Sequence, residues 1–213
     1  MIIVLDLDDT LYDELSFVKS GFKAVALWLY NKFSFLPEET FSVMLQDLFQ
    51  NGRGQIFDSL LKKYGVYTKQ NVKECIRIYR KHKPDIKLYP EAEDFLERFK
   101  KYPIYVVTDG NKNVQKNKII SLGLDKKVKF CYLTHCYGIR NAKPSPYWFN
   151  YLMNKYNLKP EECISVGDCY AIDGLASLAA KVPFLYKESG PIKEIVPDHI
   201  HRIKKLVEIE KFL

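Results

Sequence analysis

From about residue 89 onward, short apolar runs that favour β-strands alternate with helical segments. Two of these runs, residues 104–107 and 164–166, are rich in valine and isoleucine. Strands that alternate with helices in this way pair in parallel, and the helices cover both faces of the sheet. Residues 1–5 add one more strand-like run, and residues 182–186 are expected to form the last. The sequence therefore predicts an α/β fold with a doubly wound parallel sheet.

Residues 14–88 interrupt this alternation directly after the first strand. Apolar side chains recur there at helical spacing in four segments, and Pro37 suits the first turn of the second one. The turn 51–54 separates the second segment from the third. We therefore expect a core formed by residues 1–13 and 89–213, with a helical domain, 14–88, inserted into it. The length of 213 residues fits such a core with an insert, because one domain takes roughly 150 residues.

Polar side chains stand out where the predicted strands end. They are Asp6 and Asp8 after the first strand, Thr108 and Asp109 after the second, Lys143 beyond the third, and Asp168 after the fourth with Asp173 five residues further on. In an open parallel sheet, ligands bind beyond the carboxyl ends of the strands. These side chains are therefore expected to line one site.

The residue types at these strand ends suit a divalent metal and a phosphoryl group. Mg²⁺ prefers oxygen ligands, which Asp6 and Asp168 can supply. A carboxylate can also attack phosphorus, provided that a metal and a lysine such as Lys143 neutralise the charge. Asp8 is placed to protonate the leaving oxygen and later to take a proton from water. Thr108 can donate a hydrogen bond to the phosphoryl group.

Asp109 is a further candidate phosphate contact, with a turn role as the alternative.

Together these segments resemble the haloacid dehalogenase-like (HAD) superfamily. Residues 6–11, Asp-Leu-Asp-Asp-Thr-Leu, match its first motif, DxDx[T/V], and Thr108 at a strand end matches the second. Lys143-Pro144 matches the third motif, and Gly167-Asp168 with Asp173 matches the fourth, GDxxxxD. All four motifs occur in the order found in the superfamily. The helical insert resembles the C1 cap of phosphoglycolate phosphatase-like members.

The resemblance implies a Rossmann-like core and a role for each motif residue. Asp6 would be the nucleophile and Asp8 the acid and base. Mg²⁺ would be held by Asp6, the main-chain carbonyl of Asp8, and Asp168. Asp173 would act in the outer coordination sphere or orient Lys143. The expected activity is Mg²⁺-dependent hydrolysis of a small phosphorylated metabolite, a phosphate monoester, through an aspartyl-phosphate.

Three alternatives differ from this phosphatase in chemistry. A phosphomutase of the same family would use the same aspartyl-phosphate but return the phosphoryl group to its substrate. A dehalogenase would lack the second aspartate, which is present here as Asp8. A non-catalytic receiver-like regulatory protein also places acids, threonine and lysine at strand ends, but its acid pair and acceptor aspartate lie on different strands, and it has no insert of about 75 residues.

Arg53 is the candidate for substrate specificity in the insert. It lies between two glycines, and its planar guanidinium suits a carboxylate, a phosphate or a hydroxyl-rich group. The alternative is an ordinary turn with a solvated arginine. Tyr12, Phe17 and Trp28 are expected to pack inside the helical domain.

Charge and composition bear on partners and location. The net charge of +7 is spread along the chain, and lysine clusters such as 112–118 and 126–129 are expected to form solvated helix faces. A nucleic-acid partner is therefore unlikely to account for the charge, and the oligomeric state stays open. No apolar run reaches the roughly 18 residues of a membrane span. The N-terminus lacks the features of a signal peptide, and five cysteines, an odd number, favour reduced thiols, so a cytoplasmic location is expected.

Overall fold

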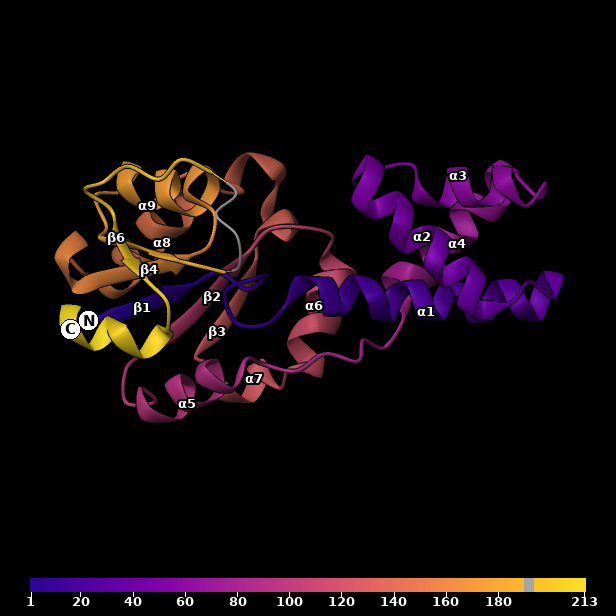
Figure 1. Ribbon diagram of the computed structural model, residues 1–213. Helices are drawn as coiled ribbons and strands as arrows, with labels where there is room; N and C mark the ends of the chain where they lie inside the picture. Colours follow the sequence, from indigo (N-terminus) through magenta and orange to yellow (C-terminus); the bar gives the residue numbers. More distant parts are fainter. Residues whose placement is uncertain (190–193) are drawn as a thin grey trace. The chain divides into compact units, whose positions relative to one another are not determined.

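The computed structural model describes residues 1–189 and 194–213, and these form two compact units (Figure 1). One unit contains Met1–Glu14 and Lys87–Leu213, and the other contains Leu15–Ile86. The first unit holds the β-sheet and the second is helical. Each is described separately below.

Within the described residues, the sheet has six parallel strands in the order β3-β2-β1-β4-β5-β6. The strands are β1 (Ile2–Leu5), β2 (Ile104–Thr108), β3 (Phe130–Leu133), β4 (Cys163–Gly167), β5 (Phe184–Lys187) and β6 (His201–Ile203). All residues of β1, β2, β4 and β5 are buried, as expected for strands covered on both faces. The predicted doubly wound α/β class is confirmed.

Helices cover both faces of this sheet (Figure 1). They are α5 (Pro90–Arg98), α6 (Lys112–Ser121), α7 (Leu124–Lys127), α8 (Tyr147–Tyr156) and α9 (Leu175–Ala179). Helices α8 and α9 pack through Trp148, Leu152 and Ala176 on the face that carries Val4 and Tyr105. Figure 1 shows α5 and α7 on the opposite side of the strands.

The C-terminal region differs from the expectation that residues 182–186 form the last strand. The chain continues into β6 and a 3-10 helix, η5 (Leu206–Phe212). Within β6 only Ile203 is buried, while His201 and Arg202 are exposed, so the sequence offers no apolar run there. Tertiary contacts support this region instead: the Glu91 carboxylate accepts a hydrogen bond from the backbone N–H of Leu206 at 2.7 Å.

The helical unit packs four helices around its own apolar core. They are α1 (Glu14–Phe33), α2 (Pro37–Asn51), α3 (Ile56–Lys63) and α4 (Lys69–Lys81). Its fully buried side chains include Phe22, Val25, Met44 and Leu61. Gly21 lets α1 approach α4 closely, because a Cβ atom at this position would lie 2.5 Å from the ring of Tyr79.

Among the helices of the described residues, none combines the length and the apolar character needed to cross a membrane.

Candidate active site

The candidate site lies where the strand order of the sheet reverses. Strand β1 is flanked by β2, which follows it in the chain, and by β4, so the carboxyl ends of these three strands border the switch point. A cavity of about 240 Å³ opens there. Its lining residues are Asp6, Asp8, Asp9, Glu14, Thr108, Asp109, Lys143, Asp168, Cys169, Ile172 and Asp173. The seven core residues predicted from the motifs are thus brought together around one cavity.

Lys143 joins two of the carboxylates. Its Nζ donates to Asp6 Oδ1 at 2.5 Å and to Asp173 Oδ1 at 2.6 Å, and its side chain is 4% exposed. Burial acts to lower the pKa of Lys143, but the Asp173 and Asp6 carboxylates outweigh it and raise that pKa. Lys143 therefore stays an ammonium. Burial also raises the pKa of Asp6 well above its usual value, and Lys143 opposes this rise.

Asp168 directly follows β4, and the preceding residue, Gly167, makes room for the neighbouring side chain of Asp173. A Cβ atom at Gly167 would clash with the carboxylate of Asp173, so the glycine is what lets Asp173 come against the strand. The Asp173 carboxylate also accepts a hydrogen bond from the backbone N–H of Cys169 at 3.2 Å. Burial, together with the Asp173 and Asp9 charges, raises the pKa of Asp168 to about 7, while a hydrogen bond from Ser189 at 3.2 Å opposes the shift.

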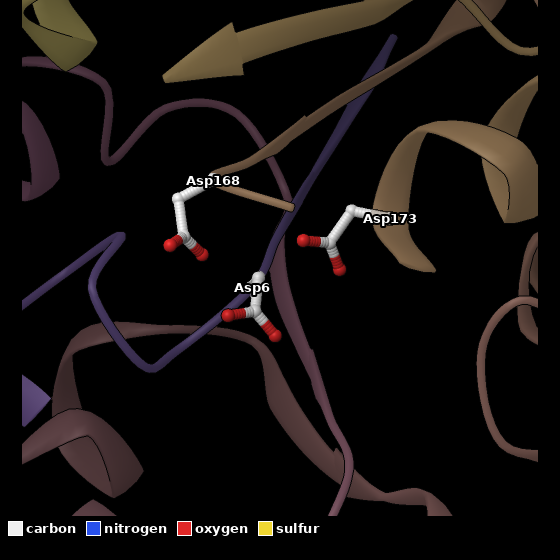
Figure 2. A group of neighbouring side chains, drawn as sticks. All are labelled: Asp6, Asp168 and Asp173. Atoms are coloured by element: carbon white, nitrogen blue, oxygen red, sulfur yellow. The ribbon is translucent and has the colours of Figure 1, made fainter. Parts of the chain in front are cut away.

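Three carboxylates could hold a metal ion. Asp6, Asp168 and Asp173 each offer an oxygen, and these oxygens lie within 4.8 Å of one another (Figure 2). Three hard oxygen donors facing one space fit Mg²⁺, and a divalent charge would offset the repulsion among them. Asp173 therefore belongs to the same group of carboxylates as Asp6 and Asp168. The predicted roles of the Asp8 carbonyl as a ligand and of Asp173 in the outer sphere stay predictions.

The Asp8 side chain has a different environment from Asp6. Its Oδ1 accepts hydrogen bonds from the Tyr12 hydroxyl and from Lys118 Nζ, the latter at 2.7 Å, and its Oδ2 accepts one from Gln115 Nε2 at 2.9 Å. Burial and the Asp8 charge raise the pKa of Tyr12, which keeps its phenol a donor. The chain turns sharply here, since Asp9 has a φ of 54°.

Thr108 and Asp109 end β2 with different contacts. Thr108 is 1% exposed, and its Oγ1 accepts a hydrogen bond from Gln115 Nε2 at 2.5 Å. Asp109 Oδ1 accepts bonds from Thr134 Oγ1 at 2.5 Å and from the backbone N–H of Lys143 at 3.3 Å. The Asp109 carboxylate thus ties β2 to the segment that carries Lys143, which fits the turn role weighed for it. Its phosphate contact stays a prediction.

Three residues around Asp8 were not expected there. Lys118 is 3% exposed and so does not lie on a solvated helix face, and Tyr12 belongs to the unit that holds the sheet and not to the helical unit. Gln115 was not singled out at all. A signal for α6 existed: Gln115, Lys118, Ile119 and Leu122 fall at helical spacing on one face, so the two polar residues share the apolar stripe.

Arg53 lies in the helical unit, in the turn between α2 and α3. Gly52 and Gly54 on either side have φ angles of 74° and 138°, a conformation that favours glycine. Arg53 lines a cavity of about 340 Å³ within this unit, together with Tyr79 and Arg80. Its role in substrate specificity stays a prediction.

Comparison with known proteins agrees with the motifs. The family model of haloacid dehalogenase-like hydrolases matches residues 1–181. A glyceraldehyde 3-phosphate phosphatase of Pyrococcus furiosus is 29% identical over 174 residues, which is 78% of this chain and 72% of that protein. A phosphoserine phosphatase of Thermus thermophilus is 26% identical over 118 residues, covering 54% of this chain and 46% of its own.

Among solved structures, the HAD-hydrolase YfnB of Bacillus subtilis, crystallised bound to magnesium, has a similar fold. It superposes with a TM-score of 0.68 at 20% identity, over 100% of this chain and 97% of its own.

Proposed function

Because this chain belongs to the haloacid dehalogenase-like hydrolase family, we propose that it is a Mg²⁺-dependent phosphatase that hydrolyses a small phosphorylated metabolite through an aspartyl-phosphate on Asp6. The observation that carries this proposal is the surroundings of the Asp6 carboxylate. This carboxylate directly follows β1, lies 2.5 Å from the ammonium of Lys143, and has two more carboxylates beside it.

In the first step, an oxygen of Asp6 attacks phosphorus and the bond from phosphorus to the leaving oxygen breaks. Asp8 gives its proton to that leaving oxygen. In the second step, water attacks phosphorus, loses a proton to Asp8, and the bond to Asp6 breaks to release inorganic phosphate. Splitting the displacement in this way replaces one difficult reaction by two easier ones.

Two anions approach each other only if their charge is offset. Lys143 supplies one positive charge at Asp6, and the hydroxyl of Thr108 can donate to a phosphoryl oxygen. Bound Mg²⁺, held by Asp6 and Asp168 with Asp173 beside them, would supply the remaining charge stabilisation. Asp8 lines the same cavity, and its carboxylate is held by three donors.

The substrate is proposed to be a small phosphate monoester, with Arg53 contacting its non-phosphate part. Relatives named for glyceraldehyde 3-phosphate and for phosphoserine make these two esters the first members of a test panel. The cytoplasmic location stays a prediction from the sequence.

The test is the release of inorganic phosphate from this panel, with Mg²⁺ and with the metal removed by a chelator. We expect Mg²⁺-dependent release from at least one ester, and no release by the Asp6→Asn variant. Transfer of the phosphoryl group to substrate without release of phosphate would indicate the mutase instead. Stable phosphorylation of the protein without turnover would indicate the receiver-like alternative.

A further inference from the structure

Helix α6 places two buried polar side chains, Gln115 and Lys118, against Asp8. They are 2% and 3% exposed, and their spacing of three residues puts them on the same face of the helix. Burying an ammonium group costs free energy unless it is paired with a charge and hydrogen-bonded. A buried lysine on this face therefore calls for a specific partner.

That partner is Asp8. Lys118 Nζ donates to Asp8 Oδ1 at 2.7 Å, and Glu14 Oε1 lies 3.8 Å from the same ammonium. The ammonium also lies 5.9 Å from the centre of the Tyr12 ring, whose hydroxyl donates to the same Asp8 oxygen. Lys118 on α6 and Tyr12 in the turn that follows β1 thus fix one oxygen of the Asp8 carboxylate.

Gln115 fixes the other oxygen. Its Nε2 donates to Asp8 Oδ2 at 2.9 Å and to Thr108 Oγ1 at 2.5 Å, which uses both hydrogens of the amide. Both partners are oxygen atoms that accept from the amide nitrogen, so these two bonds set the orientation of the Gln115 amide. Because Thr108 Oγ1 accepts from Gln115, its own proton is directed elsewhere and can be donated to a ligand.

We propose that Gln115 and Lys118 are positioning residues, which hold the Asp8 carboxylate in place for proton exchange and couple its position to Thr108. This inference rests on the proposed phosphatase function. A carboxylate oxygen can accept two hydrogen bonds, and Oδ2 accepts one from Gln115. The second position on Oδ2 is where Asp8 holds the proton that passes to the leaving oxygen and later returns from water.

If Gln115 and Lys118 position Asp8, the loss of rate on removing them should depend on the leaving group of the substrate. Proton transfer by a positioned side chain is worth about 10²- to 10⁴-fold, and a misplacement of about 1 Å can cost 10²-fold. An alkoxide leaving group needs this proton, whereas p-nitrophenolate needs it little in the first step. A displaced Asp8 therefore slows the hydrolysis of an alkyl ester more than that of p-nitrophenyl phosphate.

The experiment uses Lys118→Met and Gln115→Met, which keep side-chain length but remove the donors. The kcat and KM values are measured for glyceraldehyde 3-phosphate and for p-nitrophenyl phosphate. We expect kcat for the alkyl ester to fall roughly 10- to 100-fold, with KM changed by less than about threefold, since the lost interaction acts in the transition state. The loss for p-nitrophenyl phosphate in single-turnover phosphorylation is expected to be several-fold smaller.

Lys187→Met is the matched control. Lys187 is also buried, at 4% exposure, and is paired with Glu91 at 3.3 Å, but it does not line the candidate cavity. This variant loses a buried ion pair of the same kind, so it is expected to lower the melting temperature without changing the ratio of the two kcat values.

A second comparison separates positioning from general damage to the fold. In the Asp8→Asn background, Lys118→Met should cause little further loss of kcat, because the two residues act through one group. Equal losses for both substrates, a fully additive double variant, or unchanged kcat values would overturn the inference. Should Lys118→Met fail to fold, Gln115→Met carries the same comparisons. Failure of the proposed function is recognised separately, as undiminished phosphate release by Asp6→Asn.

Discussion

Asp6 and Asp8 are two residues apart at the same strand end, yet their side chains have different partners. Asp6 is bonded to Lys143 and faces two further carboxylates, whereas Asp8 is held by Tyr12 and α6. The first environment suits a nucleophile beside a metal, because Lys143 and a metal held by the carboxylates would supply positive charge next to the phosphoryl group. The second fixes a carboxyl group whose task is to exchange a proton.

Asp8→Asn tests this division of labour. The variant keeps the shape of the side chain but cannot give or take a proton. We expect it to slow the hydrolysis of alkyl phosphates by about 10²- to 10⁴-fold, with a smaller effect on p-nitrophenyl phosphate. Single-turnover phosphorylation measured with both esters checks the prediction. The same loss for both leaving groups would rule out the acid role.

Asp168 gives a prediction on stability and pH for the metal-free protein. Its pKa in the folded state is raised to about 7 from an ordinary value of 3.8. The folded state therefore holds a proton that the unfolded chain gives up, and this contribution to stability, present in full below about pH 4, is lost as the pH rises through 7. Ionised Asp168 in the folded protein then costs free energy.

Asp168→Asn removes that cost. In the presence of a chelator, the free energy of unfolding of the variant relative to wild type should rise by about 1–3 kcal/mol between pH 5 and pH 8. The difference in melting temperature should rise by roughly 2–10 °C over the same range. With Mg²⁺ added, wild type should gain more stability than the variant, which has lost a candidate ligand. A difference in melting temperature that is the same at both pH values would contradict the assignment.

At the scale of elements, the strands and the strand-end residues could be predicted because both follow from local patterns. Runs such as 104–107 and 164–166 are continuous and apolar, and the polar residues directly after them must lie at one edge of a parallel sheet. Strand β6 could not be found in this way. Two of its three residues are exposed, so it exists through pairing with β5 and not through its own composition.

The contact between Lys118 on α6 and Asp8 could not be predicted from the sequence. Lysines on a helix are usually solvated, and nothing in a single sequence says which lysine faces a partly buried carboxylate 110 residues away in the chain. The apolar stripe of α6 contains the information that Lys118 points inward. The identity of its partner depends on the tertiary packing of α6 against the turn after β1.

At the scale of the whole molecule, the chain consists of a sheet-containing unit with the candidate chemistry and a helical unit with its own core. All residues around the candidate cavity come from the first unit, and their chemistry is directed at a phosphoryl group and a metal. Selection among phosphate esters is therefore expected to depend on the helical unit, and Arg53 is the residue proposed for it.

Arg53→Ala tests this expectation. We expect kcat/KM for the best ester of the panel to fall, because binding energy from a remote group also supports turnover. The fall should correspond to a loss of roughly 1.5–3 kcal/mol in transition-state stabilisation, as for a charged hydrogen bond. Hydrolysis of p-nitrophenyl phosphate should be nearly unchanged. Arg77→Ala is the control, since Arg77 is an exposed arginine of the same unit that pairs with Glu74 on α4. Equal responses of the two esters would show that the turn 51–54 is only a turn.

Asp6 is proposed to carry the phosphoryl group, which can be tested by identifying the residue that becomes phosphorylated. Wild-type enzyme and Asp6→Asn are mixed with substrate and Mg²⁺, quenched in acid within the first turnover, and digested with trypsin. Fragmentation of the peptide that covers residues 1–19 by mass spectrometry then locates the added group. We predict a phosphoryl group on Asp6 in wild type, and neither the phosphopeptide nor phosphate release in Asp6→Asn. A phosphoryl group on any other residue, or turnover by Asp6→Asn at a rate near that of wild type, would contradict it.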